Sequence, residues 1–167
     1  MKSRFLTIIL VADSLLKRLV VIAMFMGTYN HTIDPKGRLS IPAKYREKLG
    51  EEFVVAKGMD GCLFVYDNDE WAAFHKQLTS LPTMTVDETR MLRRFFLSGA
   101  QTVTVDKQGR ILMPQELKEF AGLEKDVVLA GVGERIEIWS LEKWQRTTEQ
   151  LDINKITHTL AGLGISI

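Results

Sequence analysis

A short segment that occurs twice constrains the fold of this chain more than any other feature of its sequence. Residues 34–42 recur 72 residues later as residues 106–114. Four positions keep the same residue type in both copies, Asp34/Asp106, Gly37/Gly109, Arg38/Arg110 and Pro42/Pro114, and Thr32/Thr104 matches just before them. Two copies are too few for a solenoid, which needs about three or more units to bury its faces. We therefore expect a pair of similar units related by a pseudo-two-fold axis.

Each copy has the residues of a tight turn between two strands. An Asp at the first turn position can accept a hydrogen bond from the backbone two residues on. Pro35 suits the second position of a type I turn, and a left-handed Gly at the fourth position forms the bulge of a hairpin loop. The Pro that follows each Arg suits the first turn of a helix. Each copy therefore predicts a hairpin with an Asp and an Arg at its tip and a helix behind it.

The remaining residues predict short strands and helices in the same order in both halves. Strands are expected at 28–34, 38–41, 53–56 and 62–66, and again at 101–106, 110–113, 127–130 and 135–139. Helices are expected at 42–49, 70–78 and 114–121, with another capped by Ser140. A capping box from Thr85 to Glu88 is expected to begin a linker helix that reaches about residue 97.

These elements predict a mainly β, α+β fold. A unit of fewer than about 70 residues has too little core to be stable alone, so the two units are expected to close on each other. The simplest arrangement interleaves their hairpins into one small barrel with flanking short helices. The expected domains are an extension at 1–23 outside the fold, a first repeat at 24–79, a linker helix at 80–98, a second repeat at 99–150, and a tail at 151–167 that frays.

The charge and the reactive side chains exclude several classes of protein. The net charge is +1, but residues 1–23 alone carry +3, so the remaining residues sum to −2 and any nucleic-acid binding requires a local patch. The single cysteine, Cys62, excludes an internal disulfide and a cysteine-rich zinc site, and it is expected to be a buried apolar residue. The three histidines lie at no ligand spacing, so neither a metal nor a cofactor is expected.

The first 23 residues differ from the rest of the chain. Their two apolar runs, 5–12 and 19–23, are shorter than the roughly 20 residues of a membrane-spanning helix, so no membrane association is expected. A signal peptide is the alternative, although the charges within the segment argue against it. We interpret the segment as an extension, with Met24 or Met26 as the natural start.

The segment that begins at Met24 resembles the opening of the MraZ family. It reads Met-Phe-Met-Gly-x-Tyr-x-His-Thr-Ile-Asp-x-Lys-Gly-Arg-Leu-x-Ile-Pro-Ala-Lys-Tyr-Arg. The repeated Asp-x-x-x-Arg, at Asp34/Arg38 and Asp106/Arg110, resembles the signature that this family carries in each half. The resemblance covers residues 24–151, and the extension at 1–23 departs from the family pattern.

The resemblance implies a fold, a function and an assembly. The fold would be two swapped-hairpin SpoVT/AbrB-like repeats of the double-psi type. The function would be transcriptional regulation in the bacterial cytoplasm and nucleoid, through repeated double-stranded DNA sites upstream of the division and cell-wall gene cluster, including the protein's own gene. The assembly would be a homo-oligomeric ring of about eight or more subunits.

The resemblance also implies which residues bind DNA. Arg38 and Arg110 would contact the bases, because an arginine can bond a guanine bidentately in the major groove, which also admits a two-stranded β-ribbon. The other candidates are the turn residues Asp34, Lys36, Gly37, Asp106, Lys107 and Gly109, of which the two lysines suit phosphate contacts. Residues 28–48 sum to +3 and residues 101–119 to zero, so the first repeat is expected to dominate binding.

Other functions remain open on the sequence alone. Each Asp–Arg pair can be a turn-former and its ion-pair partner, a contact worth about 0–1 kcal/mol when exposed. An antitoxin-type AbrB-like DNA-binding protein shares the same hairpin, although such proteins usually carry one unit per chain. A structural ring without nucleic acid is a further alternative. An enzyme is not expected, because the sequence contains no P-loop, no dinucleotide fingerprint, no His-Glu-x-x-His and no nucleophile elbow.

Overall fold

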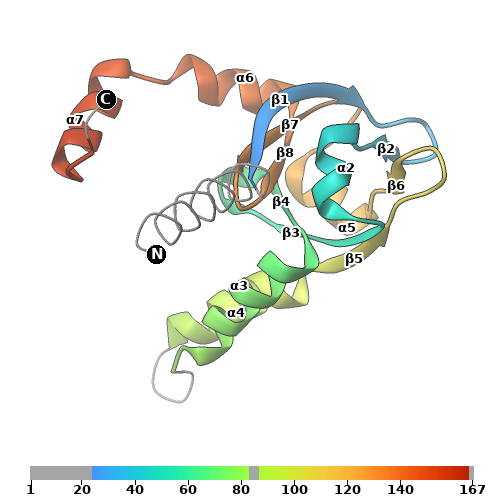
Figure 1. The fold of residues 1–167 in the computed structure, drawn as a ribbon, viewed down its shortest axis with the longest axis horizontal. Helices are drawn as coiled ribbons and strands as arrows, with labels where there is room; N and C mark the ends of the chain where they lie inside the picture. Colours follow the sequence, from blue (N-terminus) through green and yellow to red (C-terminus); the bar gives the residue numbers. More distant parts are fainter. Residues whose placement is uncertain (1–23, 83–86, 166–167) are drawn as a thin grey trace, which may run out of the picture.

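The computed structural model describes residues 24–82 and 87–165. The first half contains β1 (Phe25–Thr32), β2 (Arg38–Ser40), α2 (Ala43–Leu49), β3 (Glu52–Lys57), the 3-10 turn η1 (Met59–Gly61), β4 (Leu63–Tyr66) and α3 (Asn68–Ser80). Then follow α4 (Asp87–Ser98), β5 (Gln101–Thr104), β6 (Arg110–Leu112), α5 (Gln115–Ala121), β7 (Asp126–Gly133), β8 (Ile136–Ser140), α6 (Leu141–Glu149) and α7 (Ile153–Gly162). The strands and helices predicted from the sequence are thus confirmed, with ends that shift by a few residues (Figure 1).

Strands of the two repeats are combined in one antiparallel sheet. Its order is β1-β7-β8-β4-β3-β5, so β1 of the first repeat pairs with β7 of the second, and β5 of the second pairs with β3 of the first. A separate two-stranded ribbon joins β2 to β6. The two repeats therefore close on each other through strand pairing, as expected, whereas the interleaving of their hairpins into a barrel stays a prediction.

The hydrogen-bonded ladder of the larger sheet is open. Among the described residues it ends at β1 on one side and β5 on the other, and no closed barrel is found. The mainly antiparallel α+β class is confirmed, whereas the swapped-hairpin barrel of the double-psi type stays a prediction. The hairpins explain the open ends, because β1 and β5 each lead into a turn whose returning strand joins the ribbon instead.

The pseudo-two-fold axis passes through the ribbon. Leu39 on β2 is paired with Ile111 on β6, and these residues are equivalent in the two repeats. Both are completely buried. On either side of them the register pairs Arg38 with Leu112 and Ser40 with Arg110, as a two-fold relation requires.

Two apolar clusters cover the two faces of the larger sheet. On β4, Leu63 and Val65 join the cluster that includes the ribbon and helices α2 and α5, while Phe64 and Tyr66 face the opposite cluster. This alternation follows from the two-residue period of a strand. The second cluster is covered by side chains of α3, α4 and α6, including Trp71 and Trp144.

Cys62 lies in this second cluster and is 1% exposed. Burial raises the pKa of its thiol to about 12. A thiol with so high a pKa is protonated at neutral pH and is a poor nucleophile. The expectation of a buried apolar cysteine is confirmed.

The helices begin where short polar side chains cap them. Asp67 accepts a hydrogen bond from the backbone of Glu70 at 2.9 Å and begins α3, and Ser140 begins α6 in the same way. The capping box expected at Thr85 lies outside the described residues. Helices α3 and α4 lie side by side, with the rings of Phe74 and Phe96 5.2 Å apart, and project away from the ribbon (Figure 1).

The tail forms a helix, which the sequence analysis did not predict. The side chain of Asp152 accepts hydrogen bonds from two backbone N–H groups and begins α7. The helix stands away from the sheet (Figure 1), and its apolar residues Ile153 and Ile156 are exposed. The cap thus orders a segment that was expected to fray, although α7 contributes no buried residue to the core.

Candidate nucleic-acid interface

The first hairpin tip is a hydrogen-bonded turn organised by one carboxylate. Asp34 Oδ1 accepts from the backbone N–H groups of Lys36 and Arg38, each at 2.9 Å. The backbone N–H of Gly37 donates to the Asp34 carbonyl oxygen at 2.8 Å and closes the turn. Gly37 has φ +78°, the left-handed conformation that glycine adopts without a steric penalty. The turn predicted from the sequence is confirmed.

The second tip repeats this geometry. Asp106 Oδ1 accepts from the backbone of Gln108 at 2.9 Å and of Arg110 at 3.0 Å. Gly109 closes the turn at 2.9 Å, and its φ is again +78°. Lys36 and Lys107 are exposed at their respective tips. The structure therefore presents two nearly identical hairpin tips.

Each arginine is held by the aspartate of its own turn. Arg38 donates to Asp34 Oδ2 from Nε at 2.7 Å and pairs with it through Nη2 at 2.6 Å. Arg110 makes the same two contacts with Asp106 Oδ2, at 2.9 and 2.8 Å. Because a guanidinium has five N–H donors in a fixed plane, this pairing leaves the Nη1 edge for another partner.

The ion pairs keep both aspartates charged. The hydrogen bond from the Arg110 side chain is the main cause that lowers the pKa of Asp106 to about 2. The Arg38 side chain likewise lowers the pKa of Asp34. Both carboxylates are therefore ionised at neutral pH and can fix the orientation of their guanidinium groups.

Both arginines lie on the outer face of the β2–β6 ribbon. Residues paired across two strands point to the same side, so Arg38, Ser40, Arg110 and Leu112 share the face opposite Leu39 and Ile111. The side chains of Arg38 and Arg110 are 33% and 25% exposed. They occupy diagonal positions, whose Cα atoms lie about 7–8 Å apart in an antiparallel pair. The fold thus brings the two predicted arginines onto one surface.

The two tips lie at opposite ends of this ribbon. The backbone N–H of Ile41, just after β2, donates to Gly109 of the second turn at 2.9 Å. The equivalent Met113, just after β6, donates to Gly37 of the first turn at the same distance. Each turn is therefore attached to the other repeat, and the tips and the ribbon form one continuous surface.

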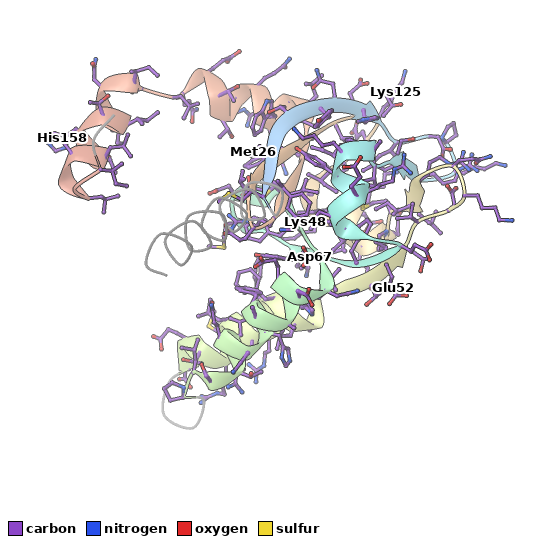
Figure 2. The ribbon with its side chains drawn as sticks, in the orientation of Figure 1. Met26, Lys48, Glu52, Asp67, Lys125 and His158 are labelled. Carbon is purple, nitrogen blue, oxygen red and sulfur yellow. The ribbon has the colours of Figure 1, made fainter. Side chains whose placement is uncertain are left out.

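The charges that the sequence assigned to the first repeat are distributed differently in space. Lys48 points away from the ribbon: its Nζ lies 3.4 Å from Asp67 and 4.3 Å from the centre of the Phe25 ring (Figure 2). Arg46 of α2 lies against Gly109, at the tip of the second repeat. Residues 28–48 carry a net charge of +3, but the positive charges of Arg46 and Lys48 do not lie at the first tip.

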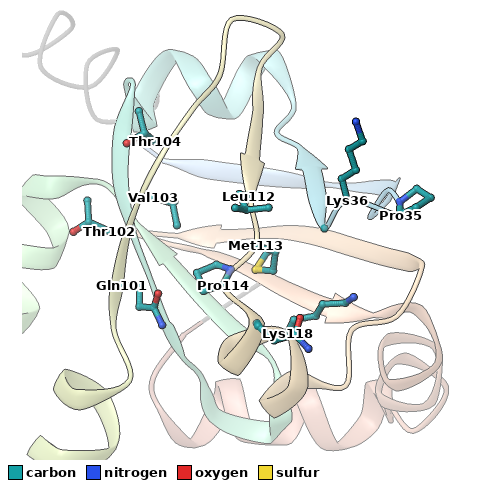
Figure 3. A pocket seen from close by; sticks show the side chains of 12 residues that line it. Pro35, Lys36, Gln101, Thr102, Val103, Thr104, Leu112, Met113, Pro114 and Lys118 are labelled. Carbon is teal, nitrogen blue, oxygen red and sulfur yellow. The ribbon is translucent and has the colours of Figure 1, made fainter.

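An open groove of about 700 Å³ lies beside the first tip (Figure 3). Lys36 and Lys118 contribute its basic side chains, and the polar strand β5 lines it together with Leu112. Leu112 is 65% exposed on the outer face of the ribbon. It alternates with the completely buried Ile111, as the two-residue period of a strand requires.

The described part of the chain shows neither a cluster of metal ligands nor a membrane-spanning helix. Residues 24–82 and 87–165 contain no group of three or more His, Cys, Asp or Glu side chains that could hold a metal ion. Within the same ranges, no helix is long and apolar enough to cross a membrane.

Comparison with known proteins identifies close relatives. The model of the family described as "MraZ protein, putative antitoxin-like" matches residues 24–94 and again 96–163. The chain is 57% identical over 127 residues to the transcriptional regulator MraZ of Heliobacterium modesticaldum, an alignment that covers 76% of this chain and 88% of that protein. It is 50% identical over 143 residues to the transcriptional regulator MraZ of Lachnoclostridium phytofermentans, covering 86% of this chain and 99% of that protein.

Proposed function

The chain belongs to the MraZ family, and from this premise we propose that it is a transcriptional regulator that binds double-stranded DNA sequence-specifically through the outer face of the β2–β6 ribbon. The observation that carries the proposal is the placement of Arg38 and Arg110 on that single face, each oriented by its own aspartate. A two-stranded β-ribbon fits the major groove, where arginine recognises guanine. The proposed function is not enzymatic.

The rest of the surface supports contact with the DNA backbone. Lys36 and Lys107 are exposed at the two tips, beyond the arginines along the ribbon. Such lysines can bind phosphates, which position a protein on the duplex without reading its sequence. The site residues proposed from the sequence, Asp34, Lys36, Gly37 and Arg38 with their counterparts Asp106, Lys107, Gly109 and Arg110, thus act together: aspartates orient, glycines shape the turns, arginines read and lysines position.

We propose the promoter upstream of the protein's own operon, in the division and cell-wall gene cluster, as the target. The protein would act in the cytoplasm, associated with the nucleoid. Repeated sites suit it because several hairpin pairs in one assembly raise the effective concentration of each pair at the next site. The interleaved strands are also compatible with the proposed swapped-hairpin repeats.

The assembly proposed is a homo-oligomeric ring of about eight or more subunits. Its support is the exposed apolar surface of α7 and the residue that follows it: Ile153 is 72% and Leu163 is 70% exposed in the isolated chain. Exposed apolar surface of this kind marks interaction sites. Sedimentation of Ile153→Ser should show a shift toward smaller species, and an unchanged distribution would exclude α7 as a subunit contact.

A binding titration tests the proposed function. The probes are a duplex from the region upstream of the gene and a scrambled duplex of equal length and composition, both at one stated salt concentration, because electrostatic affinity falls steeply with salt. Arg38→Ala should weaken binding to the upstream duplex by roughly 5- to 150-fold, the equivalent of about 1–3 kcal/mol for a bidentate base contact. Binding to the scrambled duplex should change far less.

Two results would contradict the proposal. Equal affinity of the wild type for both duplexes would remove the sequence specificity. Normal binding by Arg38→Ala and by Arg110→Ala would leave the Asp–Arg pairs as turn-stabilising contacts, and would favour a structural ring without nucleic acid. Lys76→Gln is a matched control, since Lys76 is exposed on α3, which projects away from the ribbon (Figure 1).

A further inference from the structure

We infer that Arg46 of the first repeat is a phosphate-binding residue of the second hairpin tip, so that this tip is built by both halves of the chain. The inference rests on the proposed function and extends its binding surface to a residue outside both Asp-x-x-x-Arg motifs.

The guanidinium of Arg46 lies directly against the second turn. A Cβ atom built on Gly109 would stand 2.7 Å from Arg46 Cζ, so the guanidinium occupies the space that a side chain at position 109 would need. Gly109 lies between Lys107 and Arg110 in the sequence. Arg46 and the exposed Lys107 therefore belong to the same hairpin tip.

The backbone of Ile41 ties this arrangement together. Its N–H donates to the Gly109 carbonyl oxygen at 2.9 Å, and its own carbonyl oxygen accepts from Arg46 Nε at 3.1 Å. The preceding residue on α2, Tyr45, is 1% exposed, and its hydroxyl donates to the Gly27 carbonyl oxygen at 2.6 Å. The helix that carries Arg46 is thus anchored in the core, which holds the side chain at the turn.

The charge of Arg46 is not neutralised by an ion pair. Arg38 and Arg110 each pair with an aspartate, and Lys48 lies 3.4 Å from Asp67. In the ranges that the structure describes, no carboxylate forms an ion pair with Arg46, and its single hydrogen bond uses Nε. The Nη groups of a half-buried arginine with this pattern are suited to a phosphate, which a guanidinium binds in a fork.

The other half of the molecule supplies an internal comparison. The residue equivalent to Arg46 is Lys118 on α5, 72 positions later. Lys118 lines the open groove beside Lys36 and Gly37, and a Cβ on Gly37 would meet Leu112 at 3.6 Å instead of a basic side chain. Each tip therefore has a basic residue of the other repeat nearby. Arg46 packs directly against the glycine of the second turn, whereas Lys118 does not pack against the glycine of the first turn.

Salt dependence separates a phosphate contact from other roles. Each phosphate contact contributes about 0.9 to the slope of log K against log salt. Arg46→Gln should therefore reduce this slope by about one and weaken binding by roughly three- to tenfold on the upstream and scrambled duplexes alike. Arg46→Lys keeps the charge, and it should keep the slope of the wild type.

Three comparison variants, Lys76→Gln, Arg38→Ala and Arg110→Ala, separate a failure of this inference from a failure of the proposed function. Lys76→Gln removes the same charge far from the ribbon and should leave the slope unchanged. If Arg38→Ala loses specific binding while Arg46→Gln keeps the affinity and slope of the wild type, this inference is wrong and the proposed function stands. If Arg38→Ala and Arg110→Ala both bind normally, the proposed function itself fails.

A purely structural role for Arg46 has its own signature. It would lower the melting temperature in Arg46→Gln and Arg46→Lys equally and leave the salt slope of both unchanged, which would also overturn the inference. Should Arg46→Gln not fold, the comparison passes to Arg46→Lys and Lys118→Gln. If Arg46→Lys keeps the salt slope of the wild type and Lys118→Gln reduces it, the results support phosphate contacts by a basic residue from the other repeat at each tip. A reduced slope in Arg46→Lys would contradict such contacts.

Discussion

Replacing each turn glycine by alanine should affect the two hairpins unequally, although their backbones are alike. Gly37 and Gly109 both have φ +78°, so each substitution brings the same penalty of about 1–2 kcal/mol for a left-handed residue with a Cβ. The surroundings of the added methyl group differ. At position 37 the nearest atom is Leu112 Cδ1 at 3.6 Å, an ordinary contact, whereas at position 109 it is Arg46 Cζ at 2.7 Å.

The additional effect at position 109 can be worked out from the contacts of Arg46. The guanidinium is the far end of a flexible side chain, so it can swing away from the new methyl group. In doing so it gives up its 3.1 Å hydrogen bond to the Ile41 carbonyl oxygen, which is worth about 0.5–1.5 kcal/mol. Gly109→Ala should therefore destabilise the protein by about 0.5–1.5 kcal/mol more than Gly37→Ala does.

Urea denaturation of four variants measures this difference. The two alanine variants are compared in the wild type and again in an Arg46→Ala background, at one protein concentration because assembly shifts apparent stability. In the Arg46→Ala background no side chain fills the space beside position 109. Gly37→Ala and Gly109→Ala should then lower the free energy of unfolding by the same amount. Equal destabilisation in the wild type, or a difference that persists without Arg46, would refute the packing argument.

Two further predictions concern the core and the pH dependence of the turns. Leu39→Ala, at the completely buried centre of the ribbon, should lower the free energy of unfolding by about 2–5 kcal/mol in urea, while the exposed Leu112→Ala should change it little. The lowered pKa of Asp106 means that its stabilising contribution is complete above its ordinary pKa of 3.8 and disappears as the pH falls toward about 2. Urea denaturation between pH 2 and 6 should show the wild type losing stability as the pH falls, and Asp106→Asn should show a weaker dependence of stability on pH. Identical profiles for the two proteins would exclude the contact between Asp106 and Arg110 as a cause of the pH dependence.

The turns show how much of this site can be predicted from sequence. The carboxylate of Asp34 accepts from residues two and four positions on, and Gly37 closes the turn three residues after Asp34. All of these contacts join residues at most four positions apart, so the residue types and their spacing were sufficient to predict the turn. The same holds for the caps at Asp67 and Ser140.

The distribution of charge shows what the sequence could not predict. Counting charges along residues 28–48 placed Arg46 and Lys48 with the first hairpin, and the first repeat was expected to dominate binding. In the structure Lys48 pairs with Asp67, and Arg46 lies at the second hairpin. The charge count therefore gives less support to the expectation that the first repeat dominates binding. Comparing the loss of DNA affinity in Arg38→Ala with that in Arg110→Ala tests this expectation.

The sequence alone was sufficient to predict the duplication, the two hairpin turns with their Asp–Arg pairs, and the order of strands and helices up to α6. Three features became known only from the folded chain: β2 pairs with β6, both arginines share one face of this ribbon, and Arg46 lies against a glycine 63 positions away. The physical reason is the range of the interactions. Turn and cap geometry follows from hydrogen bonds between neighbours in the chain, whereas strand pairing follows from burying residues such as Leu39 and Ile111 against each other, and no local pattern encodes that partner.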